Sequence, residues 1–237
     1  LEFRRVLFRS PAPCLTIDPT HDVPLFLGSG DENMMIVVLM ASLVTAQGQP
    51  VKLFDGKSFT GWEGDTAKTW RVEDGAIVGG SLETPVPRNE FLATTKTYRD
   101  FELTVAFKIE GDAAKANAGI QFRTKRIPNH HEVSGFQADI GQDYWGALYD
   151  ESRRKKVLAK PEKDVVAKIA TLGTWHTYKI RCEGDRIRLW VDGQATVDYT
   201  EADKAIEKDG IIALQVHGGA KTIARYKDIA IVELPAK

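Results

Sequence analysis

Hydrophobic and polar residues alternate along most of the chain, a pattern typical of β-strands that bury one face. The clearest example is the segment 101–109, in which every second residue is Phe, Leu, Val or Ile. The same period of two recurs in six further segments, which predicts six more strands. These segments are 119–125, 135–141, 176–183, 186–192, 210–217 and 223–234.

Short turn sequences containing aspartate and glycine join neighbouring strands closely enough to form hairpins. They lie at residues 73–75, 183–185 and 192–193. Helical periodicity is absent apart from a turn near 201–206, and the lysine-rich segment 152–174 is expected to be a long surface loop. Many short strands without crossover helices predict an all-β protein, an antiparallel β-sandwich that forms a single domain over residues 51–235.

Residues 34–46, MMIVVLMASLVTA, form a charge-free apolar run that is too short to span a bilayer as a stable helix. The run ends in the small residues Val44 and Ala46, a pattern that signal peptidase accepts before Gln47. We therefore expect a signal peptide at 34–46 and a secreted or periplasmic mature protein. A buried N-terminal helix is the alternative.

The first ten residues, LEFRRVLFRS, resemble the translation of a sequencing-library adaptor. The following stretch up to residue 33 shows a period of neither 2 nor 3.6. Residues 1–33 are therefore expected to be a mis-assembled leader without defined structure, and a genuine basic leader is the alternative. A peptide from before Met34 in the natively secreted protein would exclude the artefact.

The charge balance argues against nucleic acid as a partner, because 32 basic residues face 33 acidic ones and the net charge is -1. No membrane association is expected after the signal is removed. Of the two cysteines, only Cys182 lies beyond residue 46, so the mature chain has no internal disulfide. Because Cys182 falls in the apolar phase of its strand, we expect a buried core thiol and not a nucleophile.

Six phrases in the mature chain resemble, in order, the bacterial 3-keto-disaccharide hydrolase family, also described as 3-keto-glucoside lyase and hydratase. They are LFDGKSFTGW (53–62), WRVEDGAI (70–77), DFEL (100–103), AGIQFR (118–123), WGALY (145–149) and LQVHG (214–218). The resemblance implies a concanavalin A-like, laminin-G-like jelly roll, in agreement with the sandwich predicted from the pattern. It also implies a concave sheet face that holds sugars.

Strand parity predicts which polar side chains lie on that face, since residues of opposite parity point to opposite sides of a sheet. The outward set is rich in amides and aromatic groups suited to binding hydroxyls. The candidate substrate-binding residues are Arg123, Lys125, Gln137, Asp139, Trp145, Tyr149 and Gln215. An ordinary polar sheet face is the alternative interpretation of any one of them. His176 is expected to be a surface residue.

The family chemistry implied by the resemblance acts on sugars oxidised at C3, whose ketone acidifies the C2 proton. A general base removes that proton, the enolate expels the C1 substituent, and water adds to the enone. His217 is the preferred base, followed by His131, Asp150 and Glu151. A divalent metal at the enolate oxygen is an open alternative, and Asp139 could bind either a metal or a pair of hydroxyls.

Three other functions compete with this enzyme. A non-catalytic carbohydrate-binding module of the same fold would use Trp145 and Tyr149 as a stacking platform. An adhesion domain would show neither sugar binding nor turnover. A glycosidase that acts on unoxidised sugars is disfavoured, because the sequence offers no convincing pair of catalytic carboxylates.

Overall fold

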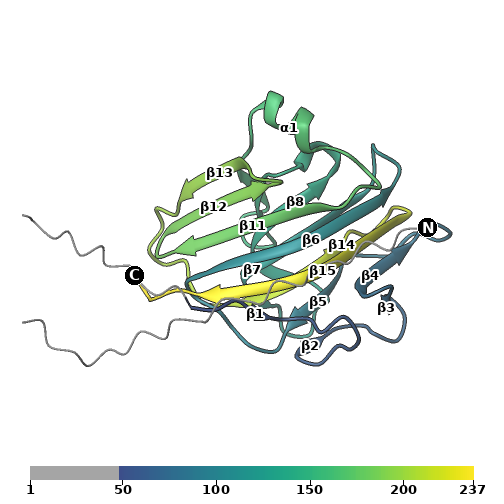
Figure 1. Cartoon of the computed structure of the whole chain (residues 1–237), viewed down its shortest axis with the longest axis horizontal. Helices are drawn as coiled ribbons and strands as arrows, with labels where there is room; N and C mark the ends of the chain where they lie inside the picture. Colours follow the sequence, from purple (N-terminus) through teal and green to yellow (C-terminus); the bar gives the residue numbers. More distant parts are fainter. Residues whose placement is uncertain (1–47) are drawn as a thin grey trace, which may run out of the picture. The chain divides into compact units, whose positions relative to one another are not determined.

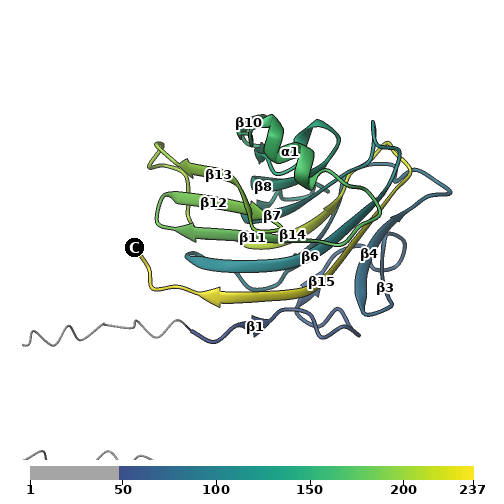
Figure 2. The same ribbon diagram turned by 45° about the horizontal axis from the view of Figure 1, so that its top comes forward.

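The computed structural model describes residues 48–237, so the expectations for the leader 1–33 and the signal peptide 34–46 lie outside the described residues. Two antiparallel sheets stack face to face as a β-sandwich, as Figures 1 and 2 show. This confirms the predicted fold class. Among the described residues, no helix is long and apolar enough to cross a membrane.

The first sheet contains eight strands in the order β13-β12-β11-β6-β15-β4-β3, and β1 pairs with β15 outside this path. The last strand of the chain, β15, lies inside this sheet, where it pairs with both β6 and β4 (Figure 1). The strands are β1 (Val51–Lys52), β3 (Trp70–Glu73), β4 (Ala76–Ser81), β6 (Phe101–Gly111), β11 (His176–Glu183), β12 (Arg186–Val191), β13 (Gln194–Thr200) and β15 (Thr222–Glu233).

The second sheet contains seven strands in the order β10-β9-β8-β7-β14-β5-β2. Its inner face packs on the first sheet, and its outer face carries most of the predicted site. The strands are β2 (Trp62–Glu63), β5 (Glu90–Thr94), β7 (Asn117–Arg126), β8 (Val133–Gly141), β9 (Leu148–Glu151), β10 (Lys156–Ala159) and β14 (Ile211–Val216).

The core lies between the sheets and is filled by the apolar parity of each strand. In β6 every second residue from Phe101 to Ile109 is at most 1% exposed, while the residues between them are half-buried. The three predicted hairpins are present as β3–β4, β11–β12 and β12–β13. Cys182 is fully buried, and this burial raises the pKa of its thiol to about 12, as expected of a core residue.

The segment 152–174 is more regular than the predicted surface loop. It contains β10, which pairs with β9, and the short helix α1 (Lys163–Ile169). Ile169, at the end of α1, is fully buried in the core. The loop prediction was wrong here because elements this short carry too few residues to establish a period.

Candidate active site

A cleft of about 200 Å³ opens on the outer face of the second sheet, next to its β8 and β9 strands. Strands β8 and β9 supply two lining residues each, a short 3-10 helix after β8 supplies two more, and the remainder come from loops and the start of β7. The lining residues are Asn89, Asn117, Gln137, Asp139, Gln142, Tyr144, Tyr149, Glu151 and His217. Acids, amides, two phenols and one imidazole therefore meet in a single hollow.

His217 follows the last residue of β14 and presents an exposed ring to the cleft. Its backbone N–H donates to the Asn117 carbonyl at 3.1 Å, which fixes the start of the turn beside β7. Its Nδ1 lies 2.8 Å from the Gly218 carbonyl oxygen. Because a carbonyl can only accept, Nδ1 carries a proton, which leaves Nε2 as the ring nitrogen that can act as a base.

Glu151, on β9, is a half-buried carboxyl in the same cleft. Loss of hydration raises its pKa above the usual range, and the neighbouring Glu132 carboxylate raises it further. A carboxyl shifted in this direction holds a proton closer to neutral pH than an exposed glutamate does. It can therefore give a proton to a departing oxygen and later take one from water.

Asp139, on β8, ends a chain of buried side chains across the sheet. Gln121 Nε2 donates to Gln137 Oε1, and Gln137 Nε2 donates to Asp139 Oδ1. Gln137 lies over Gly119, where a Cβ would stand 2.6 Å from its side-chain carbonyl carbon, so the chain requires a glycine at this position. Burial raises the pKa of Asp139 well above its usual range, so its carboxyl is suited to remain neutral and donate a hydrogen bond.

This raised pKa of Asp139 predicts how the stability of the protein changes with pH. Above the ordinary value of 3.8 the unfolded chain loses this proton while the folded chain keeps it. Folding then takes up a proton, and stability falls as pH rises towards the folded pKa, by up to about 1.4 kcal/mol per pH unit. Asp139→Asn is expected to remove this loss, as measured by urea unfolding between pH 5 and pH 8.

Asp198→Asn is the matched control for that experiment. Its carboxylate is exposed and its pKa is lowered by Arg186, so it is ionised in both states over the same pH range. The control should leave the pH dependence unchanged. An Asp139→Asn protein with the same slope as the wild type would contradict a buried neutral acid at this position.

Two tyrosines form the aromatic wall of the cleft. Tyr144 ends the short 3-10 helix η1 (Gln142–Tyr144), and Tyr149 lies on β9. Their ring centroids are 6.5 Å apart with planes at 78°, an edge-to-face pair. Tyrosine rings of this kind stack on the apolar face of a sugar while their hydroxyls bind its polar groups.

Arg123 does not reach the cleft, so its predicted substrate-binding role is wrong. It adopts a φ of +46° in a β-bulge, where β7 places Arg123 and Thr124 opposite the single residue Gly135 of β8. The extra residue breaks the alternation and turns the side chain away. Its guanidinium is buried against Asp100 at 2.6 Å and also donates to the carbonyls of Arg99 and Gly184.

The same bulge displaces Lys125, which is exposed and pairs with Glu207 outside the cleft.

Asp150 also differs from its predicted role. Its carboxylate is fully buried and accepts from Arg153 and Arg154, so it balances two cations and does not face the cleft. Asp150 shares the inward parity of Leu148, which explains this position.

Trp145 is 6% exposed and packs against Phe107 and His176 in the core, so it cannot be a stacking platform. His176 is 5% exposed and not a surface residue. Its ring contacts Asp192 Oδ2 at 2.6 Å and the Thr171 carbonyl at 2.8 Å. His176 has the same parity as the core residues of β11, so strict alternation already placed it inside.

Gln215 and His131 lie beside the cleft without lining it. Gln215 is fully buried on the outer face, opposite Gly119 and Phe91, and within residues 48–237 its amide has no hydrogen-bond partner. His131 stacks on His130 and lies 3.5 Å from Glu132, whose carboxylate accepts from Asn89 in the cleft wall. A catalytic role for His131 stays a prediction.

Four lining residues were not among the sequence-based candidates: Asn89, Asn117, Gln142 and Tyr144. Asn117 shares the outward parity of Gly119 and Gln121, so extending the strand backwards by one pair would have found it. The other three lie in loops or in η1, where no period indicates direction. Within the described part of the chain, no group of three or more His, Cys, Asp or Glu side chains could hold a metal ion.

Solved structures with the same sandwich come from proteins with little sequence identity. A provisionally named glycosyl hydrolase from Parabacteroides distasonis has a TM-score of 0.59 at 19% identity, covering 79% of this chain and 94% of its own. The carbohydrate-binding module CBM66 from Bacillus subtilis has a TM-score of 0.57 at 15% identity, and the match covers 73% of this chain and 96% of the module. The Bacillus licheniformis β-glucanase has a TM-score of 0.53 at 12% identity, and the match covers 81% of this chain and 100% of the glucanase. A search of curated proteins gave no significant match.

At these identities the likenesses establish the fold alone. Together with the family model, fold and cleft define a carbohydrate-active, hydrolase-like β-sandwich domain. The chain belongs to the family of 3-keto-alpha-glucoside-1,2-lyase-like domains, whose model matches residues 49–232. This match confirms the family resemblance seen in the sequence.

Proposed function

We propose that this protein cleaves glycosides whose glucose unit carries a ketone at C3. The observation that carries the proposal is that His217, Glu151 and Asp139 line one cleft, in states suited to a base, a proton donor and a hydrogen-bond donor. The family model and the carbohydrate-binding neighbours support a sugar as the ligand.

The first half of the reaction is an elimination. Nε2 of His217 takes the C2 proton, and the electron pair of the C–H bond forms an enolate whose oxygen accepts a hydrogen bond from the neutral Asp139 carboxyl. The enolate then restores the ketone, a double bond forms between C1 and C2, and the bond from C1 to the leaving oxygen breaks. That oxygen takes the proton of Glu151, which releases the aglycone as an alcohol.

The second half returns the enzyme to its starting state. The Glu151 carboxylate takes a proton from water as the water oxygen bonds to C1, and His217 returns its proton to C2. One water is consumed, and the products are the 3-keto sugar and the free aglycone. No oxocarbenium ion forms, so the carboxylate spacing of ordinary glycosidases is not required.

The experiment is incubation of the wild-type protein with methyl 3-keto-glucoside and with methyl glucoside. The expected result is release of methanol and transient enone absorbance from the ketone substrate alone, because only the ketone acidifies C2. In D2O, deuterium should appear at C2. Release of methanol from unoxidised methyl glucoside at a similar rate would contradict the proposal.

A non-catalytic carbohydrate-binding module is the second candidate. The edge-to-face tyrosine pair and the amide-rich lining favour it, because both bind sugars without chemistry. Such a module would bind methyl 3-keto-glucoside in calorimetry and leave it intact.

We further propose that the domain acts outside the cytoplasm, as the apolar run at 34–46 predicts. N-terminal sequencing of the exported protein would test this by showing cleavage before Gln47.

A further inference from the structure

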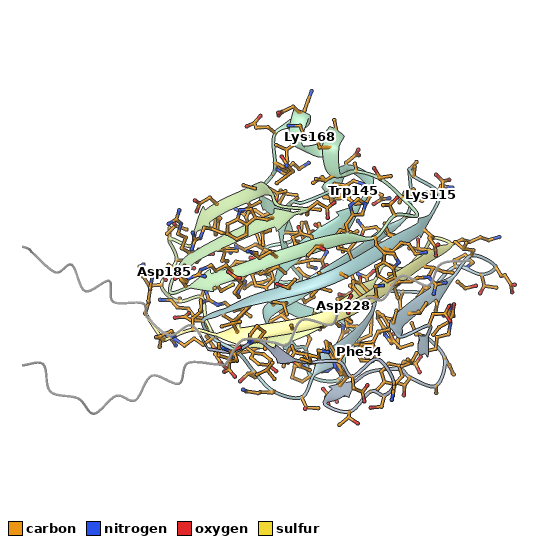
Figure 3. The ribbon with its side chains drawn as sticks, in the orientation of Figure 1. Phe54, Lys115, Trp145, Lys168, Asp185 and Asp228 are labelled. Atoms are coloured by element: carbon orange, nitrogen blue, oxygen red, sulfur yellow. The ribbon has the colours of Figure 1, made fainter. Side chains whose placement is uncertain are left out.

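A second hollow of about 590 Å³, here named the rim hollow, opens between three loops that cross from one sheet to the other. These are the loops β4–β5, β6–β7 and β14–β15. Lys115, in the β6–β7 loop, marks this end of the sandwich, opposite the Asp185 turn in Figure 3. The lining residues are Leu82, Pro85, Gly111, Asp112, Lys115, Gly219, Ala220 and Lys221.

The rim hollow adjoins the cleft, because each of the three chain segments lines both. Each segment gives two or three residues to the rim hollow and, elsewhere along the same segment, one to the cleft. Examples from the three segments are Leu82 and Asn89, Lys115 and Asn117, and Ala220 and His217. The boundary is held by hydrogen bonds: Gly219 N–H donates to the Val86 carbonyl at 2.8 Å, and Gly218 N–H donates to Asn89 Oδ1 at 3.0 Å.

The sizes of the two hollows indicate that they bind different parts of one ligand. Sites for larger organic ligands usually enclose roughly 300–1,000 Å³. At about 200 Å³ the cleft lies below that range and suits one sugar ring, so the rest of a glycoside must lie outside it. The rim hollow, at about 590 Å³, lies within the range and begins on the far side of the turn that carries His217.

The chemistry of the rim hollow differs from that of the cleft. Leu82 is one of three large apolar residues exposed in the described chain, at 47%, and it lies with Pro85 and Ala220 in the lining. Lys115, Lys221 and Asp112 are exposed beside them, and neither lysine forms an ion pair within residues 48–237. Apolar contacts flanked by ammonium groups suit an aromatic ring, whose face attracts cations.

We propose that the rim hollow binds the aglycone and that this aglycone is a phenol. This rests on the proposed function, because it places the reacting sugar in the cleft. The ring packs on Leu82 and Pro85, and the ammonium groups of Lys115 and Lys221 attract its π face. The oxygen bonded to C1 stays in the cleft and takes the proton of Glu151 as that bond breaks. The protein is then selective for aryl over alkyl 3-keto-glucosides.

The test compares Leu82→Ser with the wild type on 4-nitrophenyl and methyl 3-keto-glucosides. Leu82→Ser is expected to lower kcat/KM about tenfold for the aryl substrate and to leave the methyl substrate within twofold. Val51→Ser is the control, because Val51 is also an exposed apolar residue but lies on β1. An equal fall in kcat/KM for both substrates, or no fall for either, would overturn the proposal.

A binding measurement separates this proposal from the proposed function. Unoxidised 4-nitrophenyl glucoside lacks the acidifying ketone, so its affinity can be measured by calorimetry without turnover. Leu82→Ser should weaken this affinity about tenfold and leave that of methyl glucoside unchanged. If neither 3-keto substrate is cleaved but this difference persists, the catalytic function fails and the aglycone site stands. If both are cleaved and the difference is absent, the aglycone site fails.

Discussion

Replacing His217 by alanine is expected to lower kcat for methyl 3-keto-glucoside cleavage by about 10³-fold, the middle of the range for a general base. Nδ1 of this ring is hydrogen-bonded to the Gly218 carbonyl, so Nε2 is the nitrogen that is left to take a proton from the substrate. Without it, neither the removal of the C2 proton nor its return has an acceptor or donor in place. The measurement is steady-state kinetics together with deuterium incorporation at C2, and both should fall together.

His130→Ala is the control for this experiment. Its ring is exposed and does not line the cleft. Its kcat should stay within about threefold of the wild type, on the scale of small surface effects. The thermal midpoint of His217→Ala should be unchanged, because the ring is exposed. If His217→Ala retains turnover and C2 exchange, the base is another group, and Glu151→Gln becomes the variant to measure.

Replacing Asp100 by alanine is expected to lower the free energy of unfolding by about 3–5 kcal/mol. The pair that it forms with Arg123 is almost completely buried, and removing one partner leaves the other charge uncompensated. The same carboxylate also accepts from the backbone N–H groups of Gly184 at 3.1 Å and Lys237 at 2.8 Å. Urea unfolding followed by tryptophan fluorescence would measure the loss.

Asp198→Ala removes an acid from an exposed pair with Arg186 and serves as the control. Exposed pairs contribute about 0–1 kcal/mol, so the two variants should differ severalfold. Kinetics adds a second test. Because Arg123 lies outside the cleft, the folded fraction of Asp100→Ala should keep the wild-type KM. A raised KM with unchanged stability would restore Arg123 as a substrate-binding residue.

The alternation of residues predicted the long strands of both sheets correctly, because burial of one face imposes a strict period of two on a long strand. β11 has the predicted boundaries, and β6, β7, β8, β12, β14 and β15 differ from theirs by a few residues. The same alternation also predicts burial for two residues that the sequence analysis placed at the surface or in the site. His176 and Asp150 both have the parity of core neighbours, and both are buried in hydrogen-bonded or ionic contacts.

The candidate site was harder to predict where the backbone departs from that period. The bulge at Arg123 adds one residue to β7, and this turns a predicted groove residue into a buried structural cation. Trp145 lies between η1 and β9, where no alternation applies, and it packs inwards. Gln137, Asp139, Tyr149, Glu151 and His217 line one cleft. On β8 and β9 the alternation holds because these two strands pair without a shift from Gly135 to Ala138.

The place of β15 within its sheet also bears on how the protein is synthesised. Glu233 pairs with Phe101, and Tyr226 pairs with Ile77, so strands made early acquire their shared neighbour only when the ribosome has translated the last part of the sandwich. Contacts this distant along the chain slow folding. The first sheet of this protein therefore cannot be completed before β15 has left the ribosome, because β15 is the strand that joins β6 to β4.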